Sequence, residues 1–198
     1  MQKTLSPKST VQERKLLFDA SMQLISTGRF LNATMQEIAF QARMSEATVS
    51  YIFENRTHLL ADLIEYMATN VYNVIDDATR LSARPFKDRF FDLWKKLHQT
   101  YASTPGMPAF LNQFDVLSRN ARSLAVYPGH APRLLEFFKN APVGLIDVSD
   151  AETIAYLFHE NALSAAQMKT RAKDLSDDIS RHMPEMLWKY LADNSRLQ

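Results

Sequence analysis

The sequence of 198 residues contains no cysteine, which excludes a disulfide framework and any metal site built from thiolates. Glycine occurs only four times, and alternating β-branched runs bounded by turn residues are hard to find. No uncharged apolar run approaches the roughly 18 residues that a membrane-spanning helix needs. No early run joins basic residues to an apolar segment in the manner of a signal peptide. We therefore expect a soluble, cytoplasmic protein.

Residue patterns that carry common enzyme chemistry are also missing. There is no GxSxG elbow, no phosphate-binding glycine loop, no HExxH pair and no Glu-x-x-His pair. Metal-ligand spacing is absent among His98, His130, His159 and His182. We expect no catalytic activity, no cofactor and no metal ion. The net charge of +1 argues neither for nor against nucleic acid, because a small basic face can be hidden in a neutral total.

Apolar residues recur at steps of three and four along almost the whole chain, which predicts an all-α fold. A hydrophobic content of 46% provides for an ample core. The expected helices span residues 10–27, 34–41, 45–52, 57–78, 85–103, 109–118, 132–139, 150–173 and 176–194. Gly28 is expected to stop the first helix, and Pro184 to start or kink part of the last one.

The short helices 34–41 and 45–52, joined by a tight turn and preceded by a packing helix, have the size and order of a helix-turn-helix DNA-binding unit. Thr34 and Glu37 form a capping box, in which each side chain satisfies a free backbone N–H. The expected core contains Leu17, Ser21, Leu24, Ile25, Ile38, Ala39, Met44, Val49 and Phe53. The expected outward face contains Ser45, Glu46, Ala47, Thr48, Ser50 and Tyr51. Short, hydrogen-bonding side chains at a helix N-terminus suit contact with an anion.

The strings LFDASMQLI and ATMQEIAFQARMSEATVSYIFENRTHLL make the segment from about Val11 to Met67 resemble the N-terminal domain of the TetR-type transcriptional repressor family. Helix lengths, the turn and the residues Thr34, Ser45, Thr48, Phe53 and Arg56 fall in register together. The resemblance implies a homodimer that binds a palindromic operator in double-stranded DNA. It also implies domains at 1–56 for DNA binding and at 57–198 for ligand binding and dimerisation.

The resemblance further implies roles for single residues. Thr34 and Arg56 would contact backbone phosphates, Ser45, Glu46, Ala47 and Thr48 would lie nearest base edges, and Tyr51 would reach the backbone or a thymine methyl. Five positions depart from the family pattern, namely Arg29, Arg43, Glu46, Ser50 and Ile52. Arg43 replaces a usual glycine, which would cost about 1 kcal/mol if the backbone there is left-handed, and a phosphate contact would be a reason to keep it. Glu46 would weaken non-specific binding.

Each of these residues has a simpler explanation. Thr34 and Ser45 could serve only as helix caps. Tyr51 could pack on the connecting helix, and Arg43 and Arg56 could be solvated surface charges.

The second part of the chain is rich in aromatic residues, most of which we expect to be core. A helical domain that holds a small molecule needs large apolar side chains around a cavity, and the expected ligand-binding residues are Phe90, Trp94, Phe110, Phe114 and Tyr156. The last two helices offer a surface for a second copy. Their alanines, Ala155, Ala162, Ala165 and Ala166, would allow close approach, and an apolar stripe contains Ile179, Met183, Met186, Leu187, Tyr190 and Leu191.

Our interpretation is an all-α, ligand-responsive transcriptional repressor acting as a homodimer. A small apolar or amphipathic effector would release it from DNA. One competing interpretation is a non-inducible architectural or cell-cycle DNA-binding protein of the same fold, in which the aromatic residues are only core. A helical-bundle enzyme would need titratable groups converging on a cavity, and the sequence shows none.

Overall fold

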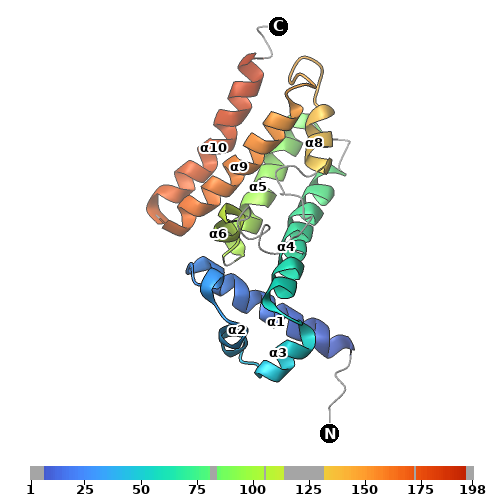
Figure 1. The fold of residues 1–198 in the computed structure, drawn as a ribbon. Helices are drawn as coiled ribbons and strands as arrows, with labels where there is room; N and C mark the ends of the chain where they lie inside the picture. Colours follow the sequence, from blue (N-terminus) through green and yellow to red (C-terminus); the bar gives the residue numbers. More distant parts are fainter. Residues whose placement is uncertain (1–6, 81–83, 105, 114–131, 172, 195–198) are drawn as a thin grey trace. The chain divides into compact units, whose positions relative to one another are not determined.

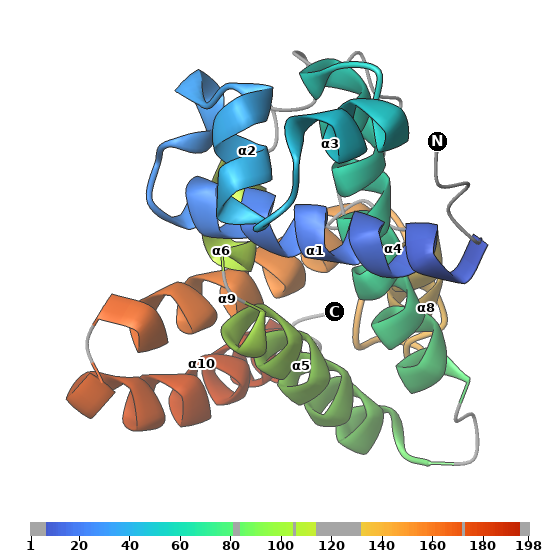
Figure 2. The same ribbon diagram turned by 90° about the horizontal axis from the view of Figure 1, so that it is seen from below.

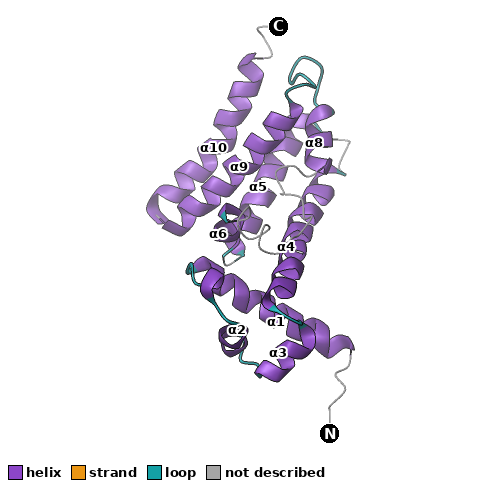
Figure 3. Cartoon of the chain, in the orientation of Figure 1, coloured by secondary structure: helices purple, strands orange, loops and turns teal. Residues whose placement is uncertain are grey.

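The computed structural model describes residues 7–80, 84–104, 106–113, 132–171 and 173–194. Every regular element in this part of the chain is helical, which confirms the predicted all-α class (Figure 3). By packing, the chain forms two compact units, Met1–Tyr66 with Pro105–Ala125, and Met67–Thr104 with Val126–Gln198. The division by packing therefore lies inside a helix and differs from the predicted functional boundary at residue 56.

The first unit contains α1 (Pro7–Ser26), the short helix η1 (Phe30–Asn32), α2 (Met35–Gln41), α3 (Glu46–Ile52), the start of α4 (Arg56–Thr79), and α6 (Met107–Asn112). Helices α2 and α3 pack on α1 and on each other (Figure 2). The predicted core is confirmed, since all its members are buried except Met44, which is half-buried. Gly28 ends α1 as predicted, with φ of +70° and its N–H bonded to the Ile25 carbonyl.

The second unit contains the rest of α4, α5 (Phe86–Ser103), α8 (Pro132–Lys139), α9 (Ala151–Arg171) and α10 (Lys173–Asn194). Helix α9 packs against α5, α8 and α10 (Figure 1). Aromatic rings pack between these helices. Phe90, for example, contacts the rings of Phe91, Phe138, Phe158 and Trp188. The core of this unit therefore lies along α5 and the face of α9 that covers it.

Two expectations about these helices are corrected. Helix α10 begins at Lys173 and continues through Pro184, so this proline does not start a helix. Pro184 is buried inside this helix, where a proline cannot donate the usual backbone hydrogen bond. The alanines Ala155, Ala162, Ala165 and Ala166 are buried within the unit, so the expectation that they face a second copy is wrong. They lie where α9 is covered by α5 and α10 of its own chain, and small side chains allow that approach.

Candidate nucleic-acid interface

Thr34 caps α2 in the way its sequence predicts. Its Oγ1 accepts a hydrogen bond from the Glu37 N–H at 3.1 Å, and Glu37 Oε2 accepts one from the Thr34 N–H at 2.8 Å. The bond from the Thr34 backbone holds the pKa of Glu37 below its ordinary value, so the carboxylate stays charged. The Thr34 hydroxyl also lies 3.2 Å from this carboxylate. A phosphate approaching Thr34 would therefore meet a committed hydroxyl and a negative charge.

The turn between α2 and α3 closes on a left-handed residue. Arg43 has φ of 56°, and it is the only residue other than glycine with positive φ in the described ranges. Its N–H bonds to the Phe40 carbonyl, and the Met44 N–H bonds to the Ala39 carbonyl. This pair of bonds is the Schellman arrangement, which satisfies the last carbonyls of a helix and usually places glycine at the left-handed position. Arg43 therefore adopts strained backbone while its side chain is exposed.

Helix α3 presents a polar face over a buried one. Ser45 caps it, accepting a hydrogen bond from the Thr48 N–H at 3.1 Å, and the two hydroxyls lie 2.8 Å apart. Val49 and the following Phe53 are buried. The opposite face is exposed as predicted at Ser45, Glu46, Ala47, Ser50 and Tyr51, while Thr48 is half-buried. Tyr51 keeps 68% of its surface exposed, so it does not pack on the connecting helix as its simpler explanation requires.

Arg56 is engaged inside the first unit. Its Nη2 donates a hydrogen bond to the Phe30 carbonyl at 2.6 Å, and its guanidinium lies 4.8 Å from the centre of the Phe30 ring. Burial lowers the pKa of Arg56, and its buried Nε has no hydrogen-bond partner among the described residues. Arg56 therefore ties the start of α4 to η1, and any phosphate contact would have to use its remaining donors.

Phe40 is an exposed residue that sequence reasoning did not single out. It lies in the last turn of α2 with 84% of its surface exposed, beside a hollow that Leu16, Gln23 and Arg43 also line. A signal was available, because Phe40 follows the inward pair Ile38 and Ala39 and a helix rotates the next residue away from the core.

Four of the five residues expected to bind a ligand lie in the described part of the chain, three in the second unit and one in the first. Phe90 and Trp94 are buried in the second unit, where the Trp94 indole N–H donates to the Asn161 side chain at 2.8 Å. Tyr156 is 40% exposed, and Phe110 is buried in the first unit. Phe114 lies outside the described residues.

Helix α5, which contains Phe90 and Trp94, also contains a buried polar group that was not predicted from the sequence. Tyr101 is fully buried, and its hydroxyl has no hydrogen-bond partner in the described part of the chain. Burial, with a smaller contribution from Glu160, raises the pKa of Tyr101 well above its ordinary value. The phenol is therefore neutral and available as a donor.

The described ranges lack two further classes of feature. No group of three or more His, Asp or Glu residues there is arranged to hold a metal ion. No helix in those ranges combines the length and the apolar character needed to cross a bilayer.

No protein-family model and no curated protein matches this sequence. Solved structures do match. The fatty acid degradation regulator FadR from Bacillus halodurans has a TM-score of 0.69 and 16% identity, with 96% of each chain covered. A TetR-family transcriptional regulator from Haemophilus influenzae has a TM-score of 0.65 and 16% identity, covering 90% of this chain and 96% of that one. Thermus thermophilus FadR, a TetR-family repressor in complex with lauroyl-CoA, has a TM-score of 0.59 and 18% identity, covering 91% and 94%.

Proposed function

We propose that this chain, which has the fold of TetR-family transcriptional regulators, is itself a TetR-like repressor that binds a palindromic operator as a homodimer. The observation that carries the proposal is the exposed polar face of α3. Ser45 caps this helix, and the buried residues Val49 and Phe53 fix its other face to the core of the first unit. A short helix with such a face can enter the major groove, where its N-terminal residues reach base edges. Residues 1–56 would bind DNA, and residues 57–198 would bind ligand and the second copy.

Base recognition would come from Ser45, Glu46, Ala47 and Thr48, and Tyr51 would contact the DNA backbone or a thymine methyl. Ser50 lies on the same exposed face. Glu46 is acidic and would favour a cytosine, because its carboxylate can accept a hydrogen bond from the cytosine amino group. Arg43 is the exposed cation nearest to α3 in sequence and would contact phosphate. Thr34 and Arg56 would contribute less, because their polar groups already bond within the first unit.

Release from DNA would follow binding of a small apolar or amphipathic effector in the second unit. The buried Tyr101 hydroxyl supports an internal guest that accepts a hydrogen bond, and Phe90 and Trp94 on the same helix would contribute apolar wall. The lauroyl-CoA complex of the Thermus thermophilus protein shows that this fold can hold an amphipathic ligand. Operator and effector would each prefer a different arrangement of α4, so each would weaken binding of the other.

The alternative is a DNA-binding protein of the same fold that needs no effector. The contacts of Phe90 with four neighbouring rings favour this alternative. A closely packed aromatic core leaves less room for a bound effector. A thermal-shift ligand screen decides between the two proposals. An effector should raise the unfolding temperature and lower the affinity for the selected operator, whereas the alternative protein should respond to no ligand.

The experiment that tests DNA recognition begins with selection of bound duplexes from a random pool. The double variant Thr48→Ala/Tyr51→Ala is then compared with wild type by fluorescence anisotropy. We expect affinity for the selected duplex to fall at least about 100-fold, because each lost contact is worth about 1–3 kcal/mol and a dimer loses it twice.

The chain offers a matched control. Thr153 and Tyr156 repeat the same residue types at the same spacing on α9, and both are exposed. The variant Thr153→Ala/Tyr156→Ala should keep its affinity for the duplex, provided that light scattering gives the same mass as for wild type. Equal DNA binding by the two double variants would contradict the assignment of α3 as the recognition helix.

A further inference from the structure

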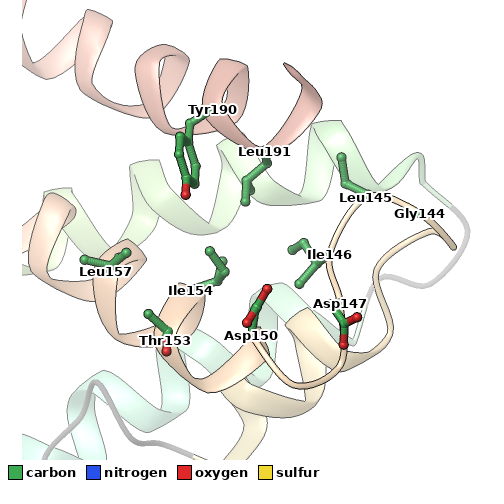
Figure 4. Close-up of a pocket in the computed structure, with 10 residues that line it drawn as sticks. All are labelled: Gly144, Leu145, Ile146, Asp147, Asp150, Thr153, Ile154, Leu157, Tyr190 and Leu191. Carbon is green, nitrogen blue, oxygen red and sulfur yellow. The ribbon is translucent and has the colours of Figure 1, made fainter. Parts of the chain in front are cut away.

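The second unit contains a cavity of about 240 Å³ (Figure 4), and the described residues that line it do not include Phe90, Trp94, Phe110 or Tyr156. Its walls come from the loop between α8 and α9, from the first turns of α9, and from the C-terminal part of α10. All of these residues belong to one compact unit, so the cavity does not depend on how the two units are arranged.

The loop wall is shaped by two consecutive turns. In the first, the Leu145 N–H bonds to the Pro142 carbonyl, and Gly144 takes φ of +82°, which a type II turn requires at its third position. In the second, the Asp150 N–H bonds to the Asp147 carbonyl and leads directly into α9. The turns present Ile146 and Asp147 on one side of the cavity, opposite the helices.

The inner surface of the cavity is apolar. Ile154 of α9 and Leu191 of α10 are buried, and Ile146 of the loop is half-buried. Leu157 and Tyr190 are exposed and form the outer edge. A ligand with a short hydrocarbon part could therefore remove apolar surface of the protein from water on several sides at once.

The charged side chains among the described residues that line the cavity are both acidic, Asp147 and Asp150. Asp150 extends toward the gap between Ile146 and Ile154 (Figure 4), and its carboxylate makes no hydrogen bond or ion pair within the described residues. The Asp147 carboxylate accepts bonds from the Ser149 N–H at 2.9 Å and from the Ser149 hydroxyl at 2.8 Å. These bonds keep the pKa of Asp147 below its ordinary value, so it is ionised at neutral pH. Among the described residues that line the cavity, none is lysine or arginine.

The start of α9 contributes a partial charge of opposite sign. A helix N-terminus carries about half a positive charge, which favours anions. The carboxylates of Asp147 and Asp150 together outweigh it about fourfold, so the net field at the cavity favours a cation.

We propose that this cavity binds a small amphipathic organic cation, with its ammonium group beside Asp147 and Asp150 and its hydrocarbon part against Ile146, Ile154 and Leu191. The volume of 240 Å³ corresponds to about eight water molecules at roughly 30 Å³ each. A primary alkylammonium of about seven non-hydrogen atoms, such as hexylammonium, matches that size. The inference concerns binding alone, and it holds whether or not the chain binds DNA.

The test is isothermal titration of the full chain, without DNA, with three probes of equal chain length: hexylammonium, 1-hexanol and hexanoate. Hexylammonium should bind with a dissociation constant of about 1 mM or tighter, 1-hexanol at least about fivefold more weakly, and hexanoate not measurably. The double variant Asp147→Asn/Asp150→Asn keeps acceptors for Ser149 and the shape of the walls. It should lose about tenfold in hexylammonium affinity and leave 1-hexanol affinity unchanged.

The control variant Asp77→Asn/Asp178→Asn changes the net charge equally, at exposed carboxylates that do not line the cavity. It should bind hexylammonium like wild type. Equal affinity of wild type for hexylammonium and 1-hexanol would overturn the proposal, as would undiminished hexylammonium binding by the Asp147→Asn/Asp150→Asn variant. If that variant does not fold, raising salt from 50 to 500 mM on wild type replaces it. Salt must then weaken hexylammonium binding and spare 1-hexanol, and any other result overturns the proposal.

Discussion

At the scale of single residues, Arg43 combines a strained backbone conformation with a proposed contact to DNA phosphate. A side chain with a Cβ in the left-handed region costs roughly 1–2 kcal/mol, and glycine at the same place would avoid it. Arg43 holds this conformation, with φ of 56°, while the hydrogen bonds of its turn are satisfied. The strain therefore comes from the residue type and not from the turn, and a phosphate contact would explain why arginine is present there.

We predict that Arg43→Gly stabilises the folded chain and weakens its binding to DNA. Relief of strain should raise the melting temperature by about 2–4 °C for about 1 kcal/mol, whereas Arg43→Ala keeps the strain and should not stabilise. Both variants should lower DNA affinity and reduce the dependence of log affinity on log salt by about one unit per subunit, while Arg43→Lys should keep most of it. Thermal unfolding and salt-dependent anisotropy measure the two effects. Unchanged salt dependence in Arg43→Ala would show that Arg43 is only a surface charge.

Residues whose contacts are local could be predicted from sequence, and those with distant partners could not. The capping box of Thr34 and Glu37 and the cap of Ser45 join residues three positions apart, so residue type and spacing were sufficient. Arg56 bonds to Phe30, 26 residues away, and no local pattern announces that partner. The exposed face of α3 could be predicted from the helical spacing of its apolar residues, because Val49 and Phe53 occupy the buried side. The cavity beside α9 depends on two turns and a distant helix, and it gave no signal.

At the scale of elements, α6 shows how closely its backbone approaches α1. Gly106 precedes α6 with φ of +76°, and a Cβ there would lie 2.3 Å from the Met22 carbonyl oxygen. Behind it, Met107, Phe110 and Leu111 are buried. The chain passes from the second unit to the first at this point, and it passes from the first unit to the second within α4. Any influence of an effector on DNA binding must use such connections, so the packing of α6 on α1 belongs to the proposed linkage.

Replacing Gly106 by alanine should be far more damaging than the same change at Gly144. Both glycines have positive φ, but a Cβ at Gly144 would meet nothing within 4 Å. Gly144→Ala should therefore cost only the backbone strain, about 1 kcal/mol, and Gly106→Ala about 2–4 kcal/mol because main-chain atoms of α1 must also move. Urea unfolding of the two variants measures the difference. Equal losses of stability would mean that α6 does not pack closely against α1.

The alanines of α9 show why neighbours of a helix are harder to predict than the helix itself. The period of apolar residues correctly predicted a helix near residues 150–173, and small residues correctly indicated close approach. Sequence alone did not say which helix approaches. Helices α5 and α10 of the same chain cover that face, which leaves Tyr156, Leu157 and Met168 as the large exposed apolar side chains of α9. A partner surface on α9 would therefore use Leu157 and Met168.

At the scale of the whole molecule, the proposed homodimer needs an apolar face that one copy cannot bury. Helix α10 supplies Met186, 69% exposed, and Tyr190, 58% exposed, which stand one turn apart on one side of the helix. Leu157 and Met168 of α9 add exposed apolar surface. Large exposed apolar side chains on two adjacent helices favour a two-fold interface. In such an interface, the same surface patch of each copy packs against the other copy. A dimer would also supply the second recognition helix that a palindrome requires.

We predict a dimer at micromolar concentration by sedimentation equilibrium, and a shift toward monomer in Met186→Asp, because each interface would bury a new charge on both sides of the two-fold axis. Val143→Asp is the matched control, since Val143 is a fully exposed apolar residue in the loop between α8 and α9. It should remain dimeric. A monomeric wild type would contradict the dimer outright. If Met186→Asp is monomeric and folded, its affinity for the palindrome should fall toward that for a half-site, because the two recognition helices then bind independently.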